Sequence, residues 1–225
     1  MRVKLAGIPV EIKAPAKTVA AYVRDYVVPE EGAAAFSAAG NDILDLHREV
    51  AEKMPLHDRL VCHGALIEAD GKGILFTAPS GTGKTTHVRL WQKHAGDRMR
   101  VINGDKPILA VEETGVTGYG TPWMGKEQMG ENSETPLSAV VLLERGETDR
   151  ILRADPAEYL ERLLMQIYLP EDPQASEKTF QLMEQLFTRV PFYVLTCTMN
   201  GSAYETAAAA LLTDSAERSR HDQDQ

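Results

Sequence analysis

The stretch GILFTAPSGTGKTTHVRL, residues 73–90, decides the fold. An apolar run over 74–77 leads into a glycine-rich turn, and a helical pattern follows to about Ala95. The turn fits the Walker pattern G-x-x-x-x-G-K-[ST] at every position except the first, where Ala78 replaces glycine. The spacing therefore predicts a strand, a phosphate-binding loop and a helix, in that order.

The residues of this turn meet the physical demands of holding a phosphate. Gly81 and Gly83 let backbone N–H groups turn inward toward an anion, and the helix N-terminus adds partial positive charge. Lys84 can reach the terminal phosphates, and the hydroxyl of Thr85 can bind Mg²⁺. A simple glycine turn before a helix would need neither side chain. We expect these residues to bind the nucleotide: Ser80, Gly81, Thr82, Gly83, Lys84, Thr85 and Thr86.

A candidate catalytic carboxylate follows the next predicted strand. Asp105 ends the segment MRVINGD, about twenty residues after the loop lysine. Because ligands bind at the carboxyl ends of strands in α/β sheets, we expect Asp105 close to the loop. Phosphoryl transfer needs a carboxylate near Mg²⁺ and a group that accepts the proton of the nucleophile. The alternative role of Asp105 is to cap the turn before Pro107.

Two further features are candidates for the site. His63 precedes the strand that leads to the loop, although a lone histidine at a strand end is more often structural. His87 and His94 lie on the loop helix and are expected to point to solvent. Residues 119–132 form a long glycine-containing segment of the kind that is often functional, with Trp123, Lys126 and Glu127 as candidate substrate contacts. Trp123 could contact a ligand or only hold this segment in place.

The composition limits the class of protein. The chain has 225 residues and a formal net charge of −9, with 33 acidic and 24 basic residues, so it lacks the basic stripe of a nucleic-acid-binding protein. The two cysteines, Cys62 and Cys197, fit no metal motif and are expected to pack as small hydrophobic residues. No apolar run is long enough for a signal peptide or a membrane span, so a cytoplasmic protein without a membrane partner is expected.

The rest of the chain alternates between strand and helix patterns, which predicts a mixed-sheet α/β domain. We expect a single domain over 1–213, with 1–57 as a strand and helix extension packed on it and 214–225 as a disordered tail. The patterns predict a hairpin over 2–12, a helix capped by Asn41, strands on both sides of a turn at 70–73, a hairpin within 106–123, a buried strand at 136–144, helices at 155–168, 175–189 and 204–214, and a strand at 191–197. In the helix predicted at 175–189, Phe180, Met183 and Phe187 form the predicted apolar stripe.

Residues 58–144 resemble the catalytic domain of HPr kinase/phosphorylase. The resemblance rests on the order His63-Gly64, hairpin, SGTGKTT and Asp105, and SGTGKTT is also similar to the loop of ATP-dependent phosphoenolpyruvate carboxykinases. It implies the P-loop fold that these two families share. It also implies that His63 lies in the active site and that Asp105 acts as general base on an acceptor hydroxyl.

The sequence departs from that family at one acidic position. HPr kinases end the strand after the loop with an Asp-Asp pair, whereas this chain has Gly104-Asp105. The missing acid puts the metal geometry and the reverse phosphorylase reaction of that family in doubt. The second glycine-rich signature of the family is also replaced, here by YGTPWMGKE, which argues against HPr itself as substrate.

Together these features predict an ATP- and Mg²⁺-dependent kinase. The catalytic residues would be Asp105, His63 and Lys84, and Thr85 and Asp105 would hold the metal. The acceptor would be a hydroxyl of Ser or Thr on a peptide or protein, or of a small metabolite. A nucleotide-sensing regulator and a plain NTPase remain alternatives. The related kinases assemble into oligomers, so a homo-oligomer is also consistent with the resemblance.

Overall fold

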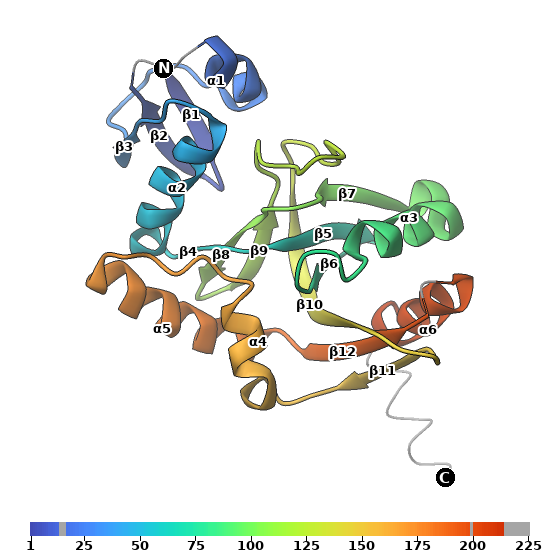
Figure 1. The fold of residues 1–225 in the computed structure, drawn as a ribbon. Helices are drawn as coiled ribbons and strands as arrows, with labels where there is room; N and C mark the ends of the chain where they lie inside the picture. The colour runs from blue at the N-terminus through green and yellow to red at the C-terminus, as the bar shows by residue number, and fades with distance from the viewer. Residues whose placement is uncertain (14–16, 199, 214–225) are drawn as a thin grey trace.

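The computed structural model describes residues 1–13, 17–198 and 200–213, which form a small N-terminal unit and a larger α/β unit (Figure 1). The predicted tail, 214–225, lies outside the described residues. The α/β fold class with a mixed sheet, predicted from the sequence, is confirmed. That 1–213 form a single domain stays a prediction. Every helix in the described part of the chain is too short or too polar to cross a bilayer.

The N-terminal unit is built on the predicted hairpin. Strands β1 and β2 pair antiparallel, and β3 adds to β2 in parallel. Its elements are β1 (Arg2–Leu5), β2 (Ile8–Ile12), α1 (Lys17–Tyr22), the 3₁₀ turn η1 (Arg24–Tyr26), β3 (Phe36–Ala38), α2 (Ile43–Lys53) and the 3₁₀ turn η2 (Met54–His57). Asp42 caps α2 by accepting from the backbone N–H groups of Leu44 and Asp45, so the predicted Asn41 cap was wrong by one residue.

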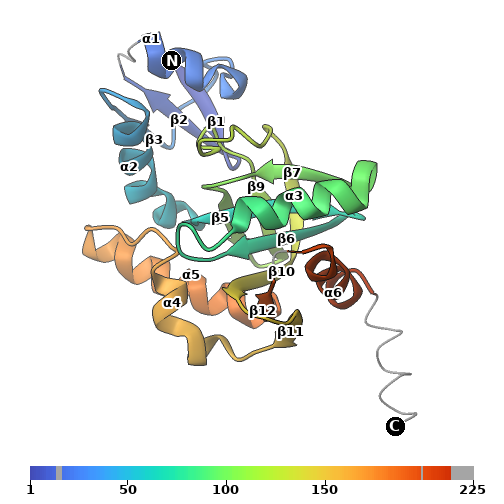
Figure 2. The same cartoon turned by 45° about the vertical axis from the view of Figure 1, so that its right-hand side comes forward.

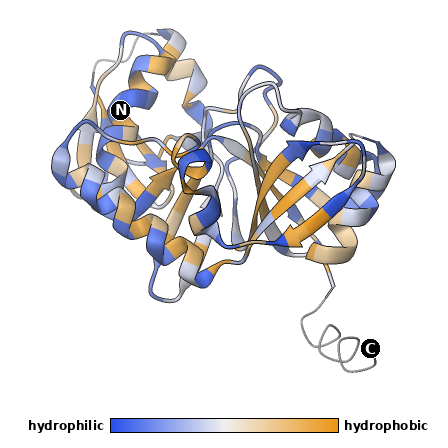
Figure 3. Cartoon of the chain, turned by 60° about the horizontal axis from the view of Figure 1, so that its bottom comes forward, coloured by the Kyte–Doolittle hydropathy of each residue, from blue (hydrophilic) through white to orange (hydrophobic). Residues whose placement is uncertain are grey.

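The larger unit is a nine-stranded sheet in the order β4-β8-β9-β10-β6-β5-β7, with β12 on β10 and β11 on β12. Strand β10 is long enough to pair with β9 at its start and with β12 at its end, in parallel with both β6 and β12. The strands are β4 (Arg59–Val61), β5 (Gly64–Ala69), β6 (Lys72–Thr77), β7 (Met99–Asn103), β8 (Ile108–Glu112), β9 (Gly115–Tyr119), β10 (Glu134–Arg145), β11 (Arg150–Arg153) and β12 (Phe192–Cys197). Figure 3 shows hydrophobic residues concentrated in the strands, while the helices carry both kinds.

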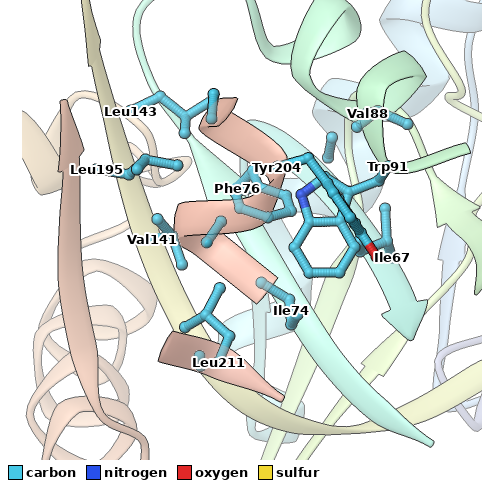
Figure 4. Packing of buried hydrophobic residues seen from close by; sticks show 14 of the residues in the cluster. Ile67, Ile74, Phe76, Val88, Trp91, Val141, Leu143, Leu195, Tyr204 and Leu211 are labelled. Carbon is cyan, nitrogen blue, oxygen red and sulfur yellow. The ribbon is translucent and has the colours of Figure 1, made fainter. Parts of the chain in front are cut away.

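Helices cover both faces of this sheet. The helical segments are α3 (Lys84–Ala95), η3 (Gly96–Arg98), η4 (Pro156–Tyr159), α4 (Leu160–Leu164), α5 (Pro173–Arg189) and α6 (Gly201–Leu211). Helices α3 and α6 share one core cluster, in which Trp91, Phe76 and Tyr204 are packed together (Figure 4). Helices α4 and α5 belong to the cluster on the other face. In Figure 2, α3 lies in front of β5; it packs against β5 and β7 and begins directly after the glycine-rich loop.

Some local predictions were wrong. Segment 155–168 is not one helix but a 3₁₀ turn followed by the short α4, although Asp155 does cap it. On α5, Met183 is buried and Phe187 packs against the core as predicted, but Phe180 is 46% exposed, and Leu182 and Leu186 complete the buried side of the helix. Both cysteines are buried, as expected.

Candidate active site

The candidate site lies where three strand ends meet. Strands β6 and β7 both flank β5 in antiparallel fashion, so their carboxyl ends lie at the edge where β5 begins. At this edge β6 leads into the phosphate loop, β7 leads to Asp105, and His63 precedes β5. The N–H of Gly64 donates to the carbonyl of Asp105 at 2.8 Å. The sheet therefore brings together His63 and Asp105, which lie far apart in sequence.

The loop takes a tight, glycine-dependent shape. Gly81 has φ +81° and Gly83 has φ +122°, conformations that side-chain-bearing residues rarely adopt, and α3 begins directly afterwards. Ala78 replaces the first glycine of the Walker pattern. It is fully buried in the core cluster beneath the sheet, so it continues the packing of β6. Its carbonyl accepts a hydrogen bond from Lys84 Nζ at 2.6 Å. The loop therefore keeps its shape without a glycine at position 78.

Lys84, His63 and Asp105 form one chain of contacts. Lys84 Nζ lies 2.9 Å from His63 Nε2, and His63 Nδ1 lies 3.2 Å from Asp105 Oδ1. An ammonium group has only donors, so Nε2 must be the acceptor and the ring proton is assigned to Nδ1, which donates to Asp105. His63 is thus a neutral link between the loop lysine and the carboxylate.

The surroundings shift the pKa of both charged ends of this chain. Burial lowers the pKa of Lys84, and the nearby Asp105 opposes that shift. Burial acts to raise the pKa of Asp105, but the hydrogen bond from His63 and the charges of Lys106 and Lys84 outweigh it and hold this pKa below its usual value. Asp105 is therefore ionised at neutral pH.

A cavity of about 850 Å³ opens beside these residues. Of the predicted nucleotide-binding residues it is lined by Ser80, Gly81, Gly83, Lys84, Thr85 and Thr86. Thr82 lines a neighbouring hollow instead. His63 and Asp105 line the main cavity, and so do the three candidate substrate contacts, Trp123, Lys126 and Glu127. Apart from Thr82, the structure brings the predicted site residues together around one cavity, while their roles stay predictions.

The missing acid at position 104 has a steric explanation. A Cβ on Gly104 would lie 3.0 Å from the carbonyl oxygen of Met129 and 3.4 Å from that of Met124. The N–H of Gly104 also donates to the Met129 carbonyl at 2.8 Å. The segment that follows β9, residues 120–133, therefore occupies the space that an acidic side chain would need.

Trp123 holds this segment in place. It is 4% exposed, and its indole N–H donates to the carbonyl of Ile43 at the start of α2 at 2.9 Å. Of the two roles left open by the sequence, its packing fits the structural one. Glu127 pairs with Arg89 of α3, whereas Lys126 is exposed at the cavity. His87 does not point to solvent as predicted: it is fully buried, and its Nε2 accepts from the indole of Trp91.

Sequence reasoning missed Arg145, which ends β10 beside the loop. Its guanidinium donates to the carbonyls of Gly81 at 2.6 Å and Thr82 at 3.0 Å. The signal was available, because β10 is parallel to β6 and its carboxyl end must lie beside the loop. Tyr22 and Leu44 also line the cavity, and no pattern in the sequence linked the N-terminal unit to it.

The residues present suit Mg²⁺. No group of three His, Cys, Asp or Glu side chains within the described ranges could hold a metal ion. Mg²⁺ does not require one, since it keeps several waters and binds one or two carboxylates together with substrate phosphates. The Thr85 hydroxyl and the Asp105 carboxylate line the same cavity and are oxygen donors of this kind.

The fold and the site define a mixed-sheet α/β protein with a glycine-rich, Walker-like loop between the central strand β6 and helix α3. The family model described as SynChlorMet cassette protein ScmC matches residues 42–213, three quarters of the chain. The chain therefore belongs to the ScmC family. The first 41 residues lie outside the matched range.

Other comparisons add little. No curated protein matches the chain. Among solved structures, the HPr(Ser) kinase/phosphatase from Coxiella burnetii is similar at 12% identity and a TM-score of 0.38, covering 67% of this chain and 94% of that one. A likeness at this level says nothing about the activity of this protein.

Proposed function

We propose that this protein is an ATP- and Mg²⁺-dependent kinase that transfers the γ-phosphoryl group to a hydroxyl, with Ser or Thr of a peptide or protein as the preferred acceptor. The observation that supports this best is the chain of contacts from Lys84 through His63 to Asp105, beside the glycine-rich loop. A loop that only binds a nucleotide does not require a histidine that links its lysine to a carboxylate in this way.

Each residue has a role in the proposed reaction. Backbone N–H groups of the loop hold the phosphates, and Lys84 neutralises charge that develops on the transferring group. Mg²⁺, held by Thr85 and Asp105, would neutralise charge on the phosphate oxygens. The acceptor oxygen forms a bond to the γ-phosphorus as the bond to the bridging oxygen of ADP breaks, and the hydroxyl proton passes to Asp105.

The lowered pKa of Asp105 fits a particular kind of base. A weakly basic carboxylate takes up little of the hydroxyl proton before the bond to phosphorus forms, which suits the loose transition state of phosphoryl transfer. Its main contribution is to orient the hydroxyl, while His63 fixes the carboxylate. Most of the rate enhancement would then come from positioning and electrostatics.

The test uses γ-labelled ATP, Mg²⁺ and size-fractionated lysate of the native cell. Label on a peptide or protein band supports the proposal, and mass spectrometry then identifies the acceptor. Label in a small-molecule fraction would instead indicate a metabolite kinase. Label that appears only as free phosphate, or stays on ATP, would overturn the kinase and favour the NTPase or the nucleotide-binding regulator, which the missing acid at Gly104 keeps as an alternative.

A further inference from the structure

The part of the cavity next to Asp105 has an apolar wall. This acceptor wall consists of Tyr22, Ile43, Leu44, Met124 and Met129, all of which line the cavity. Leu44 is 61% exposed, although it lies on the first turn of α2, a helix in which Ile43 is partly buried and Leu46, Val50 and Ala51 are buried. Methionine side chains are flexible and polarizable, and they adapt to different apolar partners.

Contacts of residues 124–128 place this wall on the side of the Asp105 carboxylate. A Cβ on Gly125 would lie only 3.0 Å from Asp105 Cβ, so the segment that carries Met124 rests directly against the proposed base. Gln128 donates to the carbonyl of Gly125 at 2.5 Å and to the Tyr22 hydroxyl at 3.2 Å. Tyr22 is therefore linked to Asp105 through Gln128 and Gly125.

Leu44 is tied to the same place from the other side. The Trp123 indole donates to Ile43, next to Leu44, and the Trp123 carbonyl accepts from the N–H of Lys106, next to Asp105. Asn132 fixes the far end of the segment by donating to the carbonyl of Asp25 at 2.7 Å. The wall is thus a joint product of the N-terminal unit and residues 120–133, with a fixed relation to the proposed base.

We infer that this wall binds an apolar side chain adjacent to the acceptor hydroxyl on a peptide, so that the protein selects a Ser or Thr with a large apolar neighbour. The inference rests on the proposed function. A hydroxyl beside Asp105 has its neighbouring side chain within reach of Leu44 and Met124. The rim continues outward through exposed Leu44 and Lys126, which gives a chain a surface to lie along where a small alcohol would not extend.

The test compares three probes with γ-labelled ATP: a peptide with Ser-Leu between glycines, the matching Ser-Gly peptide, and N-acetyl-leucinol. We expect kcat/KM for the Ser-Leu peptide to exceed that for Ser-Gly at least about 10-fold, as burial of one apolar side chain allows. Leu44→Ala should reduce this ratio about threefold or more. Leu56→Ala is the matched control, because Leu56 is exposed on the same unit but does not line the cavity.

Equal kcat/KM for the two peptides would overturn the inference that the acceptor wall binds an apolar side chain. An equal loss of preference in Leu44→Ala and Leu56→Ala would overturn it too. N-acetyl-leucinol that reacts as well as the Ser-Leu peptide would overturn the choice of a peptide. Fluorescence anisotropy of the labelled peptides on the Asp105→Asn variant with ADP and Mg²⁺ measures the preference without transfer. If the Ser-Leu peptide binds more tightly but the wild type transfers no phosphate, the kinase function is overturned and the role of the acceptor wall stands. If the wild type transfers phosphate without preferring either peptide, the role of the acceptor wall is overturned and the kinase function stands.

Discussion

His63 lies between Lys84 and Asp105, with Nε2 2.9 Å from the lysine ammonium and Nδ1 3.2 Å from the carboxylate. A single neutral imidazole therefore holds both groups that the proposed transfer requires. Each ring nitrogen makes one of these contacts, so replacing the ring removes both at once.

Replacing His63 with alanine should lower the single-turnover rate about 10- to 100-fold, because Asp105 loses the hydrogen bond that orients it. The pH profile separates this from general damage. In the wild type the pKa of Asp105 is held below its usual value, so the carboxylate stays ionised as the pH falls to 5. In the variant burial is less opposed, this pKa rises, and the rate should decline at a higher pH than in the wild type. A pH profile of the variant that coincides with that of the wild type would contradict the role.

Replacing Asp105 with asparagine should reduce transfer about 10²- to 10⁴-fold, the range for loss of a general base. The nucleotide dissociation constant should change only a few-fold, since the loop is untouched. Asp70→Asn is the control, because Asp70 lies in the β5–β6 turn and pairs with Arg98 away from the cavity. Rapid-quench kinetics and nucleotide titration give the two values. Wild-type transfer by Asp105→Asn would exclude it as base.

Arg145 should act by holding the outward carbonyls of the phosphate loop. Its side chain is exposed, so each hydrogen bond is worth less than a buried one. Arg145→Ala should weaken nucleotide binding about 3- to 10-fold, measured by calorimetry. Arg150→Ala, which removes an exposed arginine from β11, should leave affinity unchanged. Equal affinities in both variants would show that the loop keeps its shape without the arginine.

The loop could be predicted from its pattern of glycine, lysine and threonine, and Asp105 could be predicted because a strand end places the next residue at the sheet edge. His63 was expected in the site only from the resemblance to HPr kinases, because a lone histidine at a strand end is more often structural. The sequence did not indicate that Tyr22 and Leu44 reach the cavity, since this depends on how the N-terminal unit is joined to residues 120–133 by Trp123 and Gln128. His87 was misplaced for a similar reason. A polar residue on a helix is expected to face water, but Trp91 one turn later supplies a buried donor for it.

Gly104 should not tolerate a side chain. A Cβ there meets the backbone carbonyl oxygens of Met129 and Met124, which cannot rotate away as a flexible side chain would. Gly104→Ala should therefore destabilise the fold by about 1–3 kcal/mol, as overpacking usually does. A drop of several degrees in Tm is the corresponding thermal change. Gly201→Ala is the control, because its Cβ would meet only the exposed ring of His94. Similar Tm values for the two variants would mean that the segment yields easily.

Two buried histidines should make the fold sensitive to mild acid. Burial lowers the pKa of both His47 and His87 from 6.5 to about 4, and the charge of Lys106 adds to the shift at His47. Between these values the unfolded chain binds protons that the folded chain does not, so stability falls as pH falls from about 6.5 toward about 4. Between pH 7.5 and 5 the loss should be about 2 kcal/mol for each histidine.

Urea denaturation at pH 7.5 and 5 tests this sign and size. His87→Gln keeps an acceptor for the Trp91 indole but cannot gain a proton, so it should show a smaller loss between the two pH values. His94→Gln, on the exposed side of the same helix, should keep the wild-type loss. If His87→Gln and the wild type lose the same free energy of unfolding, then His87 accepts a proton within the folded protein and its burial does not control acid stability.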